Sequence, residues 1–207
     1  MFLENPPNLS EQFGSIEVIC GSMFSGKTEE LIRRLKRAQL AKYKVIVFKP
    51  FTDNRHENNM IVSHDKNQLK AVTVKSCNEI ISHTKGFNVI AIDEAQFFDK
   101  DIVVVCNKLA NTGFRVIVAG LDMDFKGNPF GSMPDLMAIS ESVTKLHAIC
   151  CKTGKIAHYT YRKDDCDDDL IVIGDKENYE ALSREVFYNT MLAKSNKKTK
   201  DLSLIHI

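Results

Sequence analysis

The sequence contains no tryptophan, no long apolar run and almost no net charge. Among 207 residues, 28 lysines and arginines balance 27 aspartates and glutamates, which leaves a formal net charge of +1. No apolar run approaches the roughly 18 residues of a membrane-spanning helix. A near-neutral chain also gives no electrostatic reason to expect a nucleic-acid partner. We therefore expect a protein that contacts neither membrane nor nucleic acid.

The sequence also lacks the pattern of a secretory signal at its N-terminal segment and that of a disulfide framework among its cysteines. Residues 1–8 hold no basic segment followed by a long apolar one, so we expect no secretory signal and a cytoplasmic protein. The cysteines do not follow the even spacing of a disulfide framework; they are Cys20, Cys77, Cys106, Cys150, Cys151 and Cys166. In a reducing compartment we expect them to be free thiols unless a metal collects them.

Short apolar runs alternate with amphipathic helical patterns over the first 120 residues. The apolar runs predict strands at 16–19, 45–48, 69–74, 89–92 and 116–118. Helical spacing predicts helices at 27–41, 78–84 and 101–112. This alternation is typical of an α/β fold with a mostly parallel sheet flanked by helices.

The pattern changes after residue 120. Residues 121–133 predict a functional loop and 134–142 a short helix, while two apolar runs around Lys152-Thr153-Gly154-Lys155 predict a β-hairpin. A further helix is expected at 179–192. The predicted organisation is a flexible arm (1–14), an α/β domain (15–144), a small hairpin domain (145–192) and a disordered tail (193–207).

The strongest motif is Gly21-Ser22-Met23-Phe24-Ser25-Gly26-Lys27-Thr28, which fits the P-loop pattern G-x-x-x-x-G-K-[ST]. It lies between a predicted strand and a predicted helix, as a P-loop requires. Its backbone N–H groups and the helix N-terminus form an anion site. We expect Lys27 to reach the β- and γ-phosphates of ATP, and the Thr28 hydroxyl to bind Mg²⁺.

A second motif is an apolar strand that ends in two acids, Asp93 and Glu94. Ligands of open α/β sheets bind at the carboxyl edge, where such a strand ends. Asp93 is therefore a candidate Mg²⁺ ligand and Glu94 a candidate base toward an attacking oxygen. The alternative, an acidic pair that begins a solvated loop, is weaker beside a P-loop.

These motifs alone leave three functions open. A P-loop with two acids fits an ATPase that activates water and equally a kinase that activates an alcohol. A binding module without activity is the third alternative. The intact set of Lys27, Thr28, Asp93 and Glu94 argues against that last one.

Three segments together resemble the thymidine kinase family that has a P-loop core. They are 21–28, Asp93-Glu94-Ala95-Gln96-Phe97-Phe98, and Gly-Leu-Asp-Met-Asp-Phe-Lys-Gly-Asn-Pro-Phe-Gly at 120–131. The likeness runs from about residue 15 to residue 190. It implies transfer of the γ-phosphate of ATP to the 5′-hydroxyl of deoxythymidine, a step of pyrimidine deoxynucleoside salvage. It also implies a homotetramer and feedback inhibition by deoxythymidine triphosphate (dTTP).

The resemblance assigns roles at the phosphate side of the site. Glu94 is the implied catalytic base, and Arg55 is implied to stabilise transition-state charge beside Lys27. The implied ATP site comprises the P-loop with Asp53, Asp93, Glu94, Ala95 and Gln96.

The resemblance also implies a nucleoside pocket in two parts. The first part surrounds the flat thymine with apolar groups and a few polar ones, from Met23, Gln96, Phe97, Leu121, Phe125 and Phe130. The second is a long loop, the lasso, over about 153–183. Its implied contact residues are Leu170, Ile171, Val172, Ile173, Gly174 and Tyr179.

The sequence departs from the family at the base of the lasso. Many members hold a structural zinc with two C-x-x-C pairs, which here would fall at Cys150, Thr153, Ser183 and Val186. Three of these four cannot replace thiolates, so we expect the zinc site to be lost. The alternative set of Cys150, Cys151, His158 and Cys166 does not have the spacing of a zinc site. Hydrophobic packing or subunit contacts must then hold the hairpin.

Overall fold

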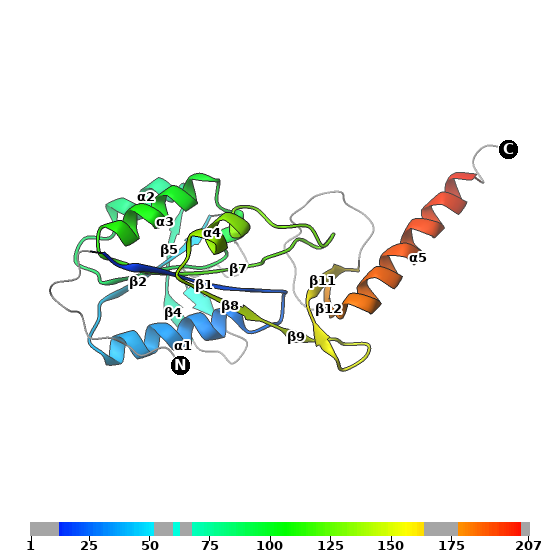
Figure 1. Ribbon diagram of the computed structural model, residues 1–207, viewed down its shortest axis with the longest axis horizontal. Helices are drawn as coiled ribbons and strands as arrows, with labels where there is room; N and C mark the ends of the chain where they lie inside the picture. Colours follow the sequence, from blue (N-terminus) through cyan, green and yellow to red (C-terminus); the bar gives the residue numbers. More distant parts are fainter. Residues whose placement is uncertain (1–12, 52–59, 63–67, 164–177, 204–207) are drawn as a thin grey trace.

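The computed structural model describes residues 13–51, 60–62, 68–163 and 178–203. Figure 1 shows a large part, built on a sheet with helices above and below it, and a smaller part that ends in a long helix. We call the smaller part, residues 148–162 and 179–203, the C-terminal unit. Within the described residues, no helix is both long enough and apolar enough to cross a membrane.

The large part is built on a six-stranded sheet in which every neighbouring pair is parallel. In spatial order its strands are β5 (Val72–Val74), β2 (Val45–Pro50), β6 (Val89–Ile92), β7 (Arg115–Gly120), β1 (Ser15–Gly21) and β8 (Ser142–Leu146). The predicted α/β fold with a mostly parallel sheet is therefore confirmed.

Alternate residues of the strands bury on opposite faces of this sheet. Val18 and Cys20 pack toward α2 (Cys77–Ser82), α3 (Asp101–Asn111) and α4 (Met133–Ile139). Ile19 packs toward α1 (Lys27–Leu40) on the other face. Helices α1, α2 and α3 begin and end close to the predicted residues. Gly113, with a φ of 93°, follows α3, and a glycine with positive φ is the usual residue just after a helix.

The strand expected at 69–74 is two separate strands. β4 (Gln68–Lys70) pairs with β3 (Met60–Val62) in an antiparallel ribbon, whereas β5 joins the main sheet. The ribbon also includes a strand, β3, at residues where the sequence pattern predicts none. Ile61 and Ala71 are buried in the cluster beneath α1, which explains why this short polar stretch pairs there.

The C-terminal unit contains two short antiparallel ribbons. β9 (Ala148–Ile149) pairs with β10 (Ile156–Ala157), as the hairpin prediction required, and β11 (Tyr159–Arg162) pairs with β12 (Tyr179–Leu182). A cluster of Ala148, Cys150, Ala157, Tyr159, Tyr161, Ala181, Leu182 and Phe187 forms its core. We call this set the aromatic cluster.

The helix predicted over 179–192 is wrong at its start. Residues 179–182 form β12, because pairing with β11 buries Tyr179, Ala181 and Leu182. The helix is α5 (Arg184–Ser203), which runs outward from the unit in Figure 1. It extends well into the 193–207 stretch predicted as a disordered tail; no glycine or proline interrupts it.

Candidate active site

Three chain segments that end neighbouring strands converge at the carboxyl edge of the sheet. The P-loop follows β1, Asp93 follows β6 and Leu121 follows β7, which lies between the other two strands. Parallel strands bring such segments together at one edge, where ligands of open α/β sheets bind. The two sequence motifs therefore meet in space, as predicted.

The shape of the P-loop depends on two glycines. Gly21 has a φ of 143°, and a Cβ there would lie 2.2 Å from the carbonyl oxygen of Leu146. Gly26 has a φ of 84° and is the N-cap of α1. Side chains at either position would strain the backbone, so both are required for the turn.

Polar groups of the P-loop remain available to a ligand. The Lys27 ammonium is buried and donates to the carbonyl oxygen of Ser22 at 2.8 Å. The hydroxyls of Ser22 and Ser25 are buried, and neither has a hydrogen-bond partner among the described residues. Buried hydroxyls normally have partners, and phosphate oxygens would supply them.

Asp93 connects the P-loop to β6. Its Oδ2 lies 3.5 Å from the Thr28 hydroxyl, and its Oδ1 accepts a hydrogen bond from the Glu94 N–H at 3.0 Å. Hydroxyl and carboxylate oxygens are the ligands that Mg²⁺ prefers, and this ion usually completes its shell with phosphates and water. Within the described residues, no group of three or more His, Cys, Asp or Glu side chains could hold a metal by itself.

Glu94 is held by a chain of hydrogen bonds through Gln96. Glu94 has a left-handed backbone, with φ 54° and ψ 43°, and begins the short 3-10 helix Ala95–Phe97. The Gln96 amide nitrogen donates to the Glu94 carboxylate, while its oxygen accepts from the Leu121 N–H at 2.9 Å. Both the nitrogen and the oxygen of the Gln96 amide therefore have hydrogen-bond partners. Through Gln96, the backbone after β7 orients the Glu94 carboxylate.

Two glycines make room for Gln96. A Cβ on Gly120 would lie 2.7 Å from its side-chain oxygen, and one on Gly131 would lie 2.4 Å from its carbonyl oxygen. Gly120 and Gly131, which flank the 121–130 loop, thus have to lack a side chain because Gln96 lies so close to them. Their place in the family-like segment 120–131 is explained by this close approach.

The predicted aromatic residues fall into two groups. Phe97 and Phe130 meet edge to face, with ring centroids 5.7 Å apart. Phe125 instead lies under the guanidinium of Arg162, 3.9 Å from its ring centroid. Arg162 belongs to β11, where its Cα partner is Tyr179, another predicted nucleoside residue. The loop after β7 thus joins the two parts of the expected pocket.

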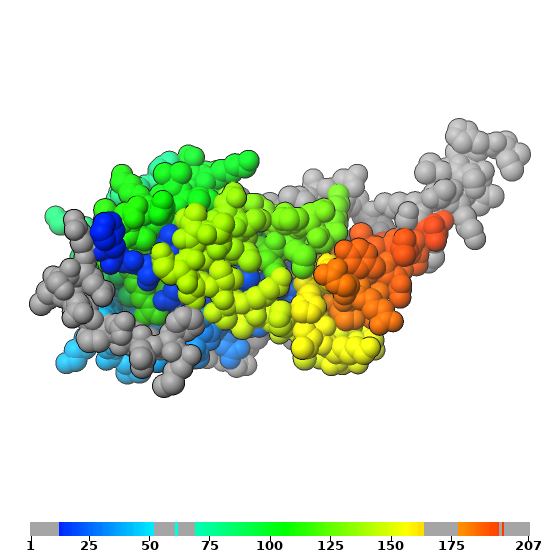
Figure 2. Space-filling model, in the orientation of Figure 1, coloured from blue at the N-terminus to red at the C-terminus, as the bar shows by residue number. Residues whose placement is uncertain are grey.

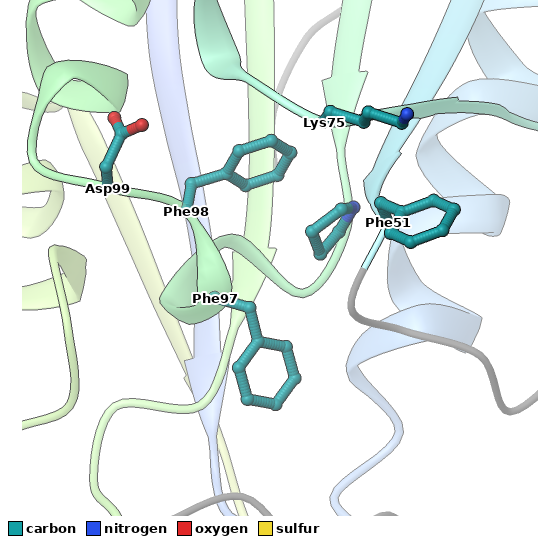
Figure 3. Close-up of a pocket in the computed structure, with 6 residues that line it drawn as sticks. Phe51, Lys75, Phe97, Phe98 and Asp99 are labelled. Atoms are coloured by element: carbon teal, nitrogen blue, oxygen red, sulfur yellow. The ribbon is translucent and has the colours of Figure 1, made fainter.

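Phe97 also lines a hollow of about 500 Å³ at the carboxyl ends of β2, β5 and β6. Figure 3 shows the Phe97 and Phe98 rings on one side, with Phe51 and Lys75 opposite them. Lys75 lies 5.6 Å from the centroid of the Phe51 ring. Phe51 and Lys75 belong to no sequence motif, because they follow separate strands, β2 and β5, that only the sheet brings together.

Polar residues that the sequence motifs did not mark also shape the 121–131 loop. Asp122 forms an ion pair with Lys145 at 2.8 Å. Asp124 accepts hydrogen bonds from the N–H groups of Lys126 and Asn128, which closes the loop on itself. An Asp followed by Gly-Asn within four residues is a turn signal that was available in the sequence.

Several predicted site residues lie outside the described residues. They are Asp53 and Arg55 on the phosphate side, and Leu170, Ile171, Val172, Ile173 and Gly174 in the lasso. Cys166, from the alternative metal set, also lies there.

Cys150 shows what stands at the position of the family's zinc. Burial raises the pKa of this thiol, but hydrogen bonds from the Thr153 hydroxyl and from the backbone of Ser183, Lys152 and Thr153 lower the pKa to about 6. Thr153 and Ser183 occupy two of the implied ligand positions. Those two positions therefore lie close enough to the Cys150 thiol to lower its pKa.

Comparisons with known proteins agree with this arrangement. The sequence model of a family described as thymidine kinase matches residues 14–187. Curated thymidine kinases from two strains of Bacteroides fragilis are 49% identical over 191 residues, which is 92% of this chain and 96% of each relative. One from Bacteroides thetaiotaomicron is 49% identical over 187 residues, 90% of this chain and 94% of the relative.

Proposed function

The chain belongs to the thymidine kinase family of ATP-dependent kinases, and from this premise we propose that it phosphorylates the 5′-hydroxyl of deoxythymidine. The products are deoxythymidine monophosphate (dTMP) and ADP. The observation that carries the proposal is the hydrogen-bonded chain from Glu94 through Gln96 to Leu121. It aims a carboxylate from the phosphate side of the site toward the loop that bears the expected nucleoside residues.

The P-loop binds the triphosphate in this proposal. Its backbone N–H groups, with the hydroxyls of Ser22 and Ser25, surround the phosphates. Lys27 leaves the Ser22 carbonyl and moves its ammonium to the β- and γ-phosphates. Ala95 and Gln96 complete the nucleotide side, together with Asp53. Arg55 adds positive charge against the charge that develops on the γ-phosphoryl group.

Thr28 and Asp93 would hold Mg²⁺, because their oxygens meet at the P-loop. When bound, the ion neutralises phosphate charge. Glu94 takes the proton from the 5′-hydroxyl as that oxygen bonds to the γ-phosphorus and the bond to ADP breaks. Gln96 keeps the carboxylate in position for this transfer.

The nucleoside lies between the Phe97–Phe130 pair and the C-terminal unit. Met23, Gln96 and Leu121 border it, and Phe125 and Tyr179 approach from the side of Arg162. The family resemblance adds Leu170, Ile171, Val172, Ile173 and Gly174 of the lasso as contact residues. We further propose that the protein is a cytoplasmic homotetramer of the deoxynucleoside salvage route, and that dTTP inhibits it.

The decisive experiment follows both products when the purified full chain is incubated with MgATP and deoxythymidine. We expect equal amounts of ADP and dTMP, and a loss of about a hundredfold or more in kcat for Glu94→Gln, since general base catalysis contributes that much. The matched control is Glu79→Gln, which changes an exposed glutamate on α2 and leaves the rate unchanged. ADP formation that ignores deoxythymidine would instead establish a water-using ATPase.

A further inference from the structure

One peptide group of the P-loop is held on both sides. The carbonyl oxygen of Ser22 accepts a hydrogen bond from the Lys27 ammonium at 2.8 Å. The N–H of Met23, which belongs to the same peptide plane, donates to the Thr160 hydroxyl at 2.9 Å. The peptide bonds of the described chain are trans, so the two groups point in opposite directions. Lys27 and Thr160 therefore fix the rotation of this plane from opposite sides.

The second holding group comes from a distant part of the chain. Thr160 lies in β11, 137 residues beyond Met23, and is only 4% exposed. Its strand neighbours Tyr159 and Tyr161 belong to the aromatic cluster. Because successive side chains of a strand alternate, Thr160 points away from the side occupied by those two tyrosines. The C-terminal unit thus places a buried hydroxyl on the P-loop.

Packing reinforces this contact at the next residue. Phe24 has a left-handed backbone, with a φ of 63°, which is unfavourable for a residue with a side chain. Its side chain packs against the aromatic cluster, together with Met123 from the loop after β7. In the space-filling view, the yellow-green surface of the large part adjoins the yellow and orange surface of the C-terminal unit (Figure 2).

We propose that Thr160 is a positioning residue for the phosphate-binding loop. Through the Met23 N–H it holds the Ser22–Met23 peptide in its rotation, so the loop keeps its shape when the Lys27 ammonium leaves the Ser22 carbonyl for the phosphates. Without the acceptor this peptide can rotate, and nucleotide binding must then restore its orientation. The C-terminal unit consequently contributes to nucleotide affinity although it lies outside the P-loop motif. This inference rests on the proposed function only for its kinetic readout.

The first test compares Thr160→Val with Thr160→Ser in the full chain. Valine keeps the shape and removes the acceptor, whereas serine keeps the hydroxyl. We expect the Kd for MgADP, measured by calorimetry, to rise about five- to tenfold in Thr160→Val and to stay near wild type in Thr160→Ser, as the loss of one hydrogen bond implies. In kinetics, KM for ATP should rise more than kcat falls. An unchanged Kd in a folded Thr160→Val protein overturns the proposal.

Thr144→Val is the matched control. The Thr144 hydroxyl accepts a hydrogen bond from Arg34 at 2.8 Å, on β8 and away from the P-loop peptide. Loss of that bond should lower Tm without changing the Kd for MgADP. If both variants weaken nucleotide binding equally, the effect of Thr160 is one of general stability and the proposal is wrong.

A second measurement follows the Met23 amide of the wild-type protein directly. With ¹⁵N-methionine labelling only methionines contribute amide signals, and the Met23 signal is identified by its disappearance in Met23→Leu. We expect the Met23 amide to exchange with solvent about a hundredfold or more slowly relative to an unstructured chain, without any nucleotide. Free exchange would overturn the proposal. Neither MgADP binding nor exchange of the Met23 amide requires deoxythymidine. Failure of deoxythymidine phosphorylation would therefore leave this inference standing.

Discussion

The large part and the C-terminal unit are stabilised in different ways. The sheet has parallel pairings of up to six residues, and aliphatic clusters cover both of its faces. The C-terminal unit has ribbons of only two and four pairs. Its core depends on a few large rings, with Tyr159 stacked on Phe187 at 4.5 Å. Stability is therefore spread over many contacts in the first region and concentrated in a few in the second.

A buried charge network adds to this contrast. Arg34 on α1 is 5% exposed and binds Glu17 of β1 at 2.6 Å and Glu30 at 2.8 Å. Arg115 of β7 binds the other oxygen of Glu17, also at 2.6 Å. Among the described residues, the ion pairs of the C-terminal unit are longer and weaker; that of Lys155 with Glu185 spans 3.9 Å between two exposed side chains. Ion pairs thus link α1, β1 and β7 in the large part, whereas the C-terminal unit is stabilised mainly by the packing of its aromatic rings.

The largest effect that would test this comparison is expected from Phe187→Ala. Phe187 is fully buried and stacks on Tyr159, so its loss should cost the C-terminal unit about 3–5 kcal/mol. We expect the unit to unfold before the sheet, which urea titration with hydrogen exchange would resolve as two transitions. Phe48→Ala, at a fully buried position of β2, should instead lower the stability of the sheet. A single shared transition in both variants would show that the two regions form one cooperative unit.

A second effect separates chemistry from stability within the large part. Lys27→Ala should lower kcat/KM about a hundred- to thousandfold, because a preorganised cation is lost from the phosphates. Tm should stay the same or rise, since the variant removes a charge that is only 9% exposed. Lys36→Ala, an exposed lysine on the same helix, is the control and should change neither quantity. A comparable loss of activity in both variants would argue against the assigned role of Lys27.

The same contrast explains which features the sequence could predict. The P-loop, the acids after β6 and the parallel sheet are specified by local patterns, and the structure brings them together as expected. β12 was mistaken for helix because strand formation there depends on pairing with β11, about 20 residues earlier. Thr160 and Arg162 carried no motif either, since each is defined by a contact with a distant loop. Non-local pairing is what single-sequence patterns do not contain.

The smallest effect compares one buried cysteine from each region. The pKa of Cys150 is lowered to about 6, against about 8.5 for an unfolded thiol. The folded state therefore holds fewer protons between these values, and the stability due to Cys150 is present above pH 8.5 and lost as the pH falls through 6. The free energy of unfolding of wild type should therefore exceed that of Cys150→Ser by more at pH 8 than at pH 6. Urea unfolding of both proteins at the two pH values measures this difference.

Cys106 in α3 should behave in the opposite sense. Burial, with a smaller contribution from Cys77, raises the pKa of Cys106 to about 12. Its contribution is fully present below pH 8.5 and is lost only as the pH rises toward 12. The difference between wild type and Cys106→Ser should therefore be flat from pH 6 to pH 8. Parallel pH profiles for the two variants would contradict the hydrogen-bonded thiolate at Cys150, and would leave the base of the lasso held by packing alone.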